Sequence, residues 1–312
     1  MTTKVEKLGL NRGRRGPGFL WSQLKKSTVA YLLLSPMFAG LLVFAYFPPI
    51  SGLYHAFFQW DVTGRSAWVG LDNFTHLFHD KIFLHSIPTM FYLLVPGLLI
   101  SIIPPFIIAE MIYSVRSQSA KYWYRVLILV PMVIPGTVGL LIWQYIYDPQ
   151  SGLLNAILHA VGFSETFQPG WLGDSTYALF SLIFLGFPWI GGTSVLIYLA
   201  GLMNIPKEVV ESAELEGGTG LKRIWYIDLP YVLGQVKFFL IFGIINGFQD
   251  YGKQLVLTQG GPNFSTTVPG YYMYQVAFTF GRLGEASAIG VLLFVVIFFL
   301  SIAGMKYFKT NE

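Results

Sequence analysis

Six long apolar segments constrain this chain of 312 residues more than any other feature. A helix needs about 20 mostly apolar residues to cross the roughly 30 Å of hydrocarbon in a bilayer. We place these segments near residues 30–50, 88–112, 124–147, 177–202, 231–248 and 286–307. Hydrophobic residues make up 54% of the chain and charged residues 12%, and a soluble domain of this length could not bury so much apolar surface. The sequence therefore predicts an all-α integral membrane protein with about six transmembrane helices.

Prolines interrupt several of these segments. They lie at positions Pro36, Pro96, Pro104, Pro105, Pro131, Pro135 and Pro188. A bilayer helix tolerates such a break only where neighbouring helices or a wet cavity satisfy the freed backbone groups. We therefore expect kinked helices that pack around an interior.

The basic residues indicate the orientation in the membrane. With the N-terminus inside, sixteen of the 20 Lys and Arg residues face the cytoplasm, and only Arg65, Lys81, Lys253 and Arg282 lie outside. Residues 1–27 form a basic cytoplasmic segment, and the apolar run after it is longer than the core of a cleaved signal peptide. Both termini are expected in the cytoplasm. The placement of the charges reports orientation, so it gives no reason to expect nucleic-acid binding.

A polar stretch separates the fourth and fifth apolar segments. Glu208, Glu211 and Glu214 recur every three residues after Pro206, and Gly217 and Gly218 follow as helix-stopping residues. A second short apolar face with Leu221, Ile224, Trp225 and Ile227 comes next, so we expect two short helices joined by a tight turn on the cytoplasmic side. The residue pattern alone is equally compatible with an ordinary amphipathic loop.

Six residues of this stretch match a signature. Glu211, Ala213, Gly217, Ile227, Leu229 and Pro230 resemble, at unbroken spacing, the E-A-A-x-x-x-G-x9-I-x-L-P motif of permease subunits in binding-protein-dependent ABC importers. Ser212, Glu216 and Gly218 depart from the usual residues by small changes of volume or chain length.

The resemblance extends over nearly the whole chain and is greatest to the maltose-type carbohydrate permeases. It includes FPPISGLYHAFFQWD, WVGLDNFTHLF, AGLMNIPKEVVESA and LVLTQGGP. The large outer insertion of the maltose subunit is absent. The resemblance implies a type I ABC importer permease (MetI-like) fold, with a transmembrane permease domain over 28–312 and a cytoplasmic coupling loop over 203–230.

The resemblance also implies a mechanism and an assembly. The loop would form a coupling helix that docks on a cytoplasmic ATPase, where Glu211 supplies a charge for a basic partner and Gly217 the tight turn. The partners would be a second homologous permease, two ATPase subunits and an external sugar-binding protein, in a bacterial cytoplasmic membrane. ATP and Mg²⁺ would be bound by the ATPase, because the 217–220 GGTG lacks the Gly-Lys-Ser/Thr of a P-loop. We therefore expect no cofactor, metal or enzyme activity in this chain.

Polar residues near the outer half of the fifth segment are candidates for the cargo path, because polar side chains within spans usually face a cavity or a partner. Asn246, Gln249 and Asp250 are the main ones, and Tyr251 adds an aromatic face beside Phe248. Trp189 and Thr193 of the fourth segment lie at comparable depth. The alternative is that Asp250 and its neighbours lie just outside the hydrocarbon, in an ordinary outer loop.

Two other classes of protein compete with a permease subunit. A stand-alone secondary transporter would show inverted repeats and midplane charges, and the sequence shows no such repeat and few such charges. An integral membrane enzyme would show converging acid–base or metal-binding residues. His76, His79 and His85 match no recognised zinc spacing, and Glu110 is expected to be an interfacial or paired structural acid rather than a proton relay.

Overall fold

Helices form most of the computed structural model, which describes residues 28–164 and 166–307. The predicted basic segment 1–27 lies outside the described residues. Contacts divide the chain into two units, residues 1–54 and 55–312. In the first unit, α2 (Thr28–Gly40), the π-helical turn η1 (Leu41–Tyr46) and α3 (Phe47–His55) follow one another without a break. This run has a mean hydropathy of 2.0, as expected for the first span.

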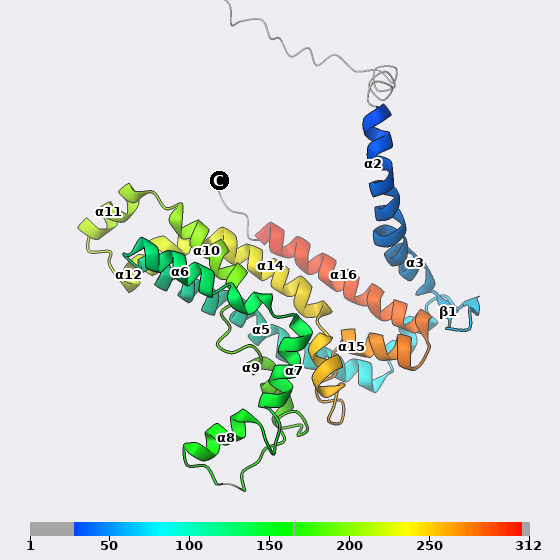
Figure 1. Cartoon of the computed structure of the whole chain (residues 1–312). Coiled ribbons are helices and arrows are strands. Elements are labelled where there is room, and N and C mark those ends of the chain that lie inside the picture. The colour runs from blue at the N-terminus through cyan, green and yellow to red at the C-terminus, as the bar shows by residue number, and fades with distance from the viewer. Residues whose placement is uncertain (1–27, 165, 308–312) are drawn as a thin grey trace, which may run out of the picture. The chain divides into compact units, whose positions relative to one another are not determined.

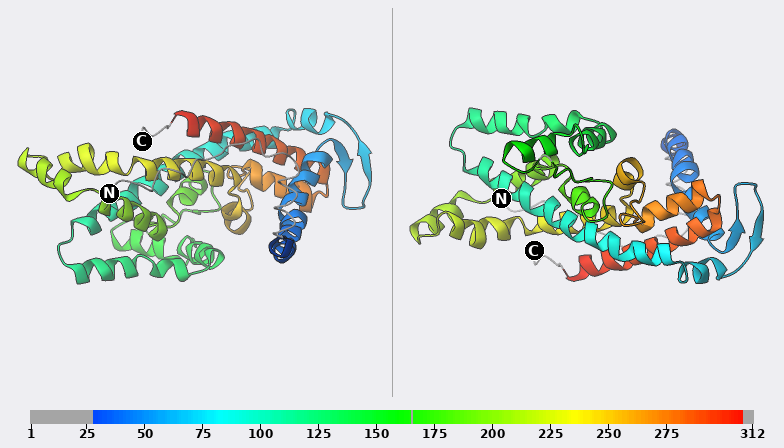
Figure 2. Two further views of the ribbon diagram at one scale, coloured as in Figure 1. Left: turned by 90° about the horizontal axis from the view of Figure 1, so that it is seen from above. Right: turned by 90° about the horizontal axis from the view of Figure 1, so that it is seen from below.

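Three long helices form the frame of the second unit. They are α5 (Lys81–Ser114), α14 (Leu233–Gln249) and α16 (Leu283–Tyr307). Helix α14 lies beside both α5 and α16 (Figures 1 and 2). Gly243 and Gly247 are spaced four apart on α14, and a side chain at either position would collide with Leu98 or Leu94 of α5. The small residues therefore let the two backbones approach closely, as in many membrane helix pairs.

Other spans are bent. Helix α6 (Gln118–Leu127) leads through the 3₁₀ turn η2 (Val130–Val133) into α7 (Gly136–Ile146), with a bend of 84°. Pro131 lies in η2 and Pro135 precedes α7, so proline interrupts this span as predicted. A second bend, of 66°, separates residues 221–231 from 233–258. Among the described residues three helices are long and apolar enough to cross a membrane, or up to five if each bent pair is one span.

The prediction of one helix over residues 177–202 is wrong. The structure has α9 (Ala178–Phe184) and α10 (Gly192–Met203), joined by seven non-helical residues. Pro188 lies in this connection and lacks the backbone N–H that a helix needs. Gly186, Trp189 and Gly191 have positive φ angles, which a right-handed helix excludes. The apolar composition of the segment concealed this break.

Several shorter elements complete the unit. Strands β1 (Phe58–Trp60) and β2 (Ser66–Trp68) pair antiparallel with Phe58 opposite Trp68, and α4 (Asp72–Leu77) follows. Helix α15 (Pro269–Tyr274) continues into the π-turn η5 (Gln275–Thr279), and η4 (Gln254–Thr258) follows α14. Helix α8 (Leu153–Ala160) follows Gly152.

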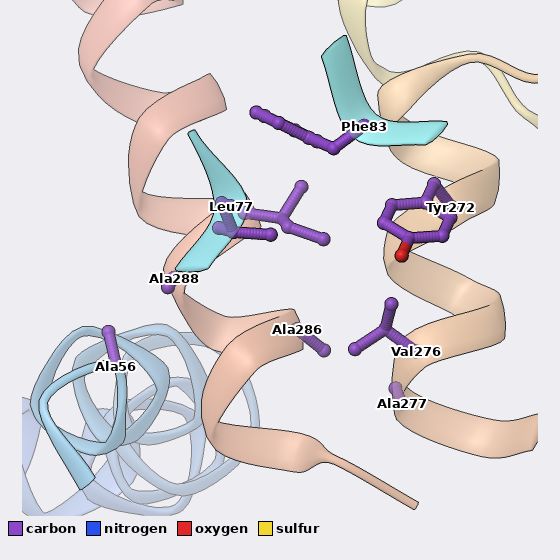
Figure 3. Packing of buried hydrophobic residues seen from close by; sticks show 9 residues of the cluster. Ala56, Leu77, Phe83, Tyr272, Val276, Ala277, Ala286 and Ala288 are labelled. Carbon is purple, nitrogen blue, oxygen red and sulfur yellow. The ribbon is translucent and has the colours of Figure 1, made fainter. Parts of the chain in front are cut away.

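Three apolar clusters hold the second unit together. In the first, Leu77 and Phe83 pack with Tyr272, Val276 and the residues around Ala286 (Figure 3). The second joins the middle of α5 to α14 and the segment after it. The third joins the far end of α5 to α10, and it lies where α11 (Lys207–Leu215) and α12 (Leu221–Arg223) project from the body (Figure 1).

Candidate functional site

The 203–230 loop folds as two short helical segments around a tight turn. Helix α11 begins after Pro206, and α12 continues through the π-turn η3 (Ile224–Asp228) into α13 (Leu229–Tyr231). Gly217 has a φ of +77°, its N–H donates to the Glu214 carbonyl at 3.1 Å, and the Gly218 N–H donates to the Ala213 carbonyl at 2.7 Å. These two bonds form a Schellman motif, which ends a helix on a glycine in the left-handed region. The predicted helix–turn–helix and the role of Gly217 in its turn are confirmed.

The loop has one face anchored to the body and one face free of it. Val209, Val210, Ile227 and Leu229 pack against the cluster formed by α5 and α10. The three glutamates of α11 are exposed, Glu211 among them. Four apolar side chains are also exposed, namely Leu215 (91%), Tyr226 (81%), Leu221 (74%) and Trp225 (66%). Such large apolar side chains in one exposed segment are typical of a surface that another protein covers.

The six signature residues thus divide by structural position. Ile227 and Leu229 anchor the loop, and Pro230 lies in the first turn of α13. Ala213 and Gly217 build the turn, and Glu211 is presented outward. Sequence reasoning missed the ion pair between Arg223 Nε and Asp228 Oδ2, which are 3.0 Å apart. The only signal was an acidic residue within the otherwise apolar IWYIDLP.

A cavity of about 610 Å³ lies between α5 and α14. Three of the predicted path residues, Asn246, Gln249 and Asp250, line it. Asp250 Oδ2 forms an ion pair with Lys253 Nζ at 2.9 Å. Asp250 follows the last residue of α14, and the chain then turns back into the body as η4 rather than leaving it as an ordinary loop.

The other predicted path residues do not line this cavity. Tyr251 stacks on Tyr274 with ring centroids 5.9 Å apart. Trp189 donates from Nε1 to the Leu185 carbonyl at 3.1 Å, and Thr193 Oγ1 lies 3.4 Å from Met132 Sδ. Phe248, expected to offer an aromatic face, is buried against Phe91. Trp189 lies in the break between α9 and α10, and the neighbouring Ser194 lines the cavity.

The cavity also contains polar residues beyond the main candidates. Ser101, Ser194, Lys253 and Gln254 line it together with the predicted residues. Gln254 is buried, and its Oε1 has no hydrogen-bond partner among the described residues. Its position after an apolar helix gave a signal, because a polar residue in such a run usually faces a cavity or a partner.

Two histidines of the predicted first outer loop contact different neighbours. His76 Nδ1 lies 3.2 Å from Glu285 Oε1, and His79 Nδ1 lies 2.8 Å from the Thr75 carbonyl. Arg282 also pairs with Glu285, at 2.8 Å. Within residues 28–164 and 166–307, no group of three His, Cys, Asp or Glu side chains is arranged to hold a metal ion.

The chain has long apolar helices, the exposed 203–230 loop at one end and a cavity between two helices. These features together are those of a membrane transport component. The family described as binding-protein-dependent transport system inner membrane component matches residues 99–310, so the chain belongs to this family.

Individual relatives agree with this assignment over nearly the full length. The chain is 30% identical to the probable ABC transporter permease protein YesP of Bacillus subtilis, over 92% of each chain. It is 29% identical to the multiple sugar-binding transport system permease protein MsmF of Streptococcus mutans, over 87% of this chain and 92% of that protein. It shares its fold with a chain of a bacterial alginate ABC transporter in complex with an alginate pentasaccharide-bound periplasmic protein. That match has a TM-score of 0.82 at 23% identity and covers 96% of this chain and 100% of the other.

Proposed function

We propose that this chain is the permease subunit of an ATP-driven ABC importer and forms the path for a sugar or oligosaccharide. An external solute-binding protein delivers the cargo, and the chain pairs with a second, homologous permease. Two ATPase subunits bind ATP and Mg²⁺ on the cytoplasmic side, and both termini of this chain face that side. The proposal rests above all on the 203–230 loop.

The loop has the surface that docking on an ATPase requires. It presents the Glu211 carboxylate and exposed Leu215, Leu221 and Tyr226, while its opposite face is fixed on α5 and α10. A loop that is rigidly anchored transmits a displacement to the spans, because it moves with them as one body. A flexible loop would change its own conformation instead. The anchoring residues therefore matter as much as the exposed ones.

The cavity between α5 and α14 supports a carbohydrate cargo. Its volume falls within the range of small-molecule sites, about 300–1,000 Å³. Asn246, Gln249 and Ser194 offer amide and hydroxyl groups to sugar hydroxyls, and the charges of Asp250 and Lys253 neutralise each other. The names of the relatives, which include a multiple sugar-binding system and an alginate transporter, support the same class of cargo.

The test is uptake by the complete importer in proteoliposomes, with an ATPase, a second permease and a binding protein that we expect to be encoded beside this chain. We expect ATP-dependent uptake of radiolabelled sugar, and we expect Glu211→Lys to reduce it by roughly 30-fold. Loss of one partner of an interfacial ion pair costs about 2–5 kcal/mol, which corresponds to at least that factor. Glu214→Lys is the matched control, since Glu214 is exposed on the same helix and lies outside the signature.

Two results would contradict the proposal. One is wild-type uptake by Glu211→Lys at normal expression. The other is uptake by the isolated chain, driven by an ion gradient without any ATPase, which would make it a secondary transporter.

A further inference from the structure

Helix α5 connects the cavity to the 203–230 loop. Its residues Leu94, Leu98 and Ser101 line the cavity, and the helix continues unbroken through 34 residues to Ser114. Near that end, Glu110 and Tyr113 are spaced three apart and therefore share one face. Both interact electrostatically with Arg223 and Asp228 of the loop. A movement of the loop can thus reach the cavity wall through a single element.

Arg223 is held at this junction from two sides. Its Nε lies 3.0 Å from Asp228 Oδ2, and its guanidinium carbon lies 5.4 Å from the centre of the Tyr113 ring. The side chain of Asp228 is fully buried. The π-turn η3 brings Arg223 and Asp228 together, because its hydrogen bonds join residues five apart. Guanidinium groups stack on aromatic rings at such distances, so the pair fixes the loop against α5.

Glu110 is the third charged group of the junction. It is 5% exposed, and neither of its carboxylate oxygens has a hydrogen-bond partner among the described residues. Asp228 Oδ1 is also without one. Lys121 lies over the outer part of the same site, 5.5 Å from the Tyr113 ring centre. Two buried carboxylates, one on the loop and one on α5, therefore interact with the partly buried guanidinium of Arg223.

We propose that Arg223 is a positioning residue that joins the loop to α5, held by Asp228 in this arrangement and able to pair with Glu110 when the loop shifts. The proposal rests on the proposed function, in which the loop moves with the ATPase. Elements that transmit a signal have two discrete arrangements, and two carboxylates on different elements give one arginine two such positions. An unpartnered buried carboxylate costs free energy, and the exchange moves this cost from Glu110 to Asp228.

The first experiment measures the ATP hydrolysed per sugar imported by the complete importer. Arg223→Gln should raise this ratio roughly tenfold, within the effect of mutations along a coupling element. Arg223→Lys keeps the positive charge but lacks the planar guanidinium. Its ratio of ATP hydrolysed to sugar imported should lie between those of Arg223→Gln and the wild type. Lys222→Gln is the matched control, because the neighbouring Lys222 is exposed and its variant should behave as wild type.

A cycle of Glu110→Gln, Asp228→Asn and the double variant tests the exchange. If Glu110 is the alternative partner, the double variant loses more coupling than the two single effects combined. Purely additive effects would overturn the role of Glu110. Unchanged ATP-to-sugar ratios in Arg223→Gln and Arg223→Lys would overturn the role of Arg223.

A distance measurement separates this proposal from the proposed function. The chain has no cysteine, so spin labels can be attached to cysteines introduced at Thr219 in the loop and Gln118 after α5. In the full-length chain in lipid nanodiscs we expect one narrow distance distribution, which Arg223→Gln broadens and Lys222→Gln leaves unchanged. An unchanged distance distribution in Arg223→Gln would overturn the proposal that Arg223 joins the loop to α5. This conclusion would hold whether or not the wild type couples to an ATPase. Failure of the wild type to couple would instead contradict the proposed function.

Discussion

The 203–230 loop and the wall of the cavity are built in opposite ways. The turn of the loop is closed by hydrogen bonds between residues three to five positions apart, such as Gly218 to Ala213. The cavity wall joins Ser101 of α5 to Asn246 of α14, which are far apart in the sequence. A local motif keeps its shape almost independently of its surroundings, whereas a wall of distant helices depends on every contact that aligns them. A single substitution in the loop should therefore abolish most of the transport activity, whereas a single substitution in the cavity wall should reduce it only in part.

Gly217→Pro should produce the largest effect. Proline fixes φ near −65°, whereas Gly217 has a φ of +77° and donates its N–H to Glu214. A misfit of this kind costs about 3 kcal/mol, so ATP-dependent uptake in proteoliposomes should fall by roughly 100-fold.

Gly162→Pro is the control for backbone strain. Gly162 also has a positive φ, +103°, but it follows α8, outside the loop. Co-purification of the ATPase should be lost in Gly217→Pro and kept in Gly162→Pro. Equal retention in both variants would show that the shape of the turn does not matter for coupling.

Substitutions in the cavity should give intermediate effects. Asp250→Ala leaves Lys253 without its ion-pair partner, and Asn246→Ala removes an amide from the wall. Lost hydrogen bonds to a charged group cost about 1.5–3 kcal/mol and those to a neutral group about 1 kcal/mol. The sugar concentration for half-maximal stimulation of ATP hydrolysis should rise by roughly tenfold and fivefold, respectively.

Thr193→Ala is the matched control, since Thr193 does not line the cavity. Basal ATP hydrolysis should be unchanged in all three variants. If Thr193→Ala shifted the response as much as Asn246→Ala, the path would follow the original sequence prediction rather than the cavity.

The smallest effect is expected at the N-terminal end of α5, where Asp80 makes both local and distant contacts. Asp80 caps the helix by accepting from the N–H groups of Ile82 and Phe83, and it also accepts from the Tyr272 hydroxyl. Partial burial acts to raise the pKa of Asp80, but these hydrogen bonds prevail and hold it below its ordinary 3.8. A depressed pKa in the folded state means that the stabilisation is present above 3.8 and is lost as pH falls through the folded-state value.

Asp80→Ala should therefore lower the thermal unfolding midpoint in detergent at neutral pH, by roughly 2–4 °C for a cap that contributes about 1 kcal/mol. The difference from wild type should vanish at low pH. Asp174→Ala, at an exposed residue outside the long helices, should show no such pH-dependent difference. A difference that persists below the folded-state pKa would contradict the charged cap.

The same contrast explains what the sequence could predict. Glu211, Gly217, Ile227 and Leu229 were assigned correctly to a helix–turn–helix because proline, glycine and apolar spacing act locally. Asn246, Gln249 and Asp250 were predicted to face the cargo because they are polar residues near the outer half of an apolar segment, and they line the cavity. Their partners could not be predicted, since nothing in the pattern of α5 indicates that Ser101 faces α14.

Two features could not have been found from composition. The break between α9 and α10 arises from positive φ angles at three residues, and apolar content is the same in a broken and an unbroken span. The pair of Arg223 and Asp228 depends on a π-turn, which is rare in helices and has no sequence signature of its own. Trp189 lies in this break and Thr193 shortly after it, and neither lines the cavity.

The length of α5 has a consequence for the charges at its end. At about 1.5 Å per residue its 34 residues measure about 51 Å, well beyond the roughly 30 Å of a hydrocarbon layer. With the helix centred in the bilayer, Glu110, four residues from its end, lies at the depth of the lipid head groups. The surrounding protein leaves only 5% of Glu110 exposed, so a lipid of different thickness would change the depth of the head groups around this junction without exposing the acid to acyl chains.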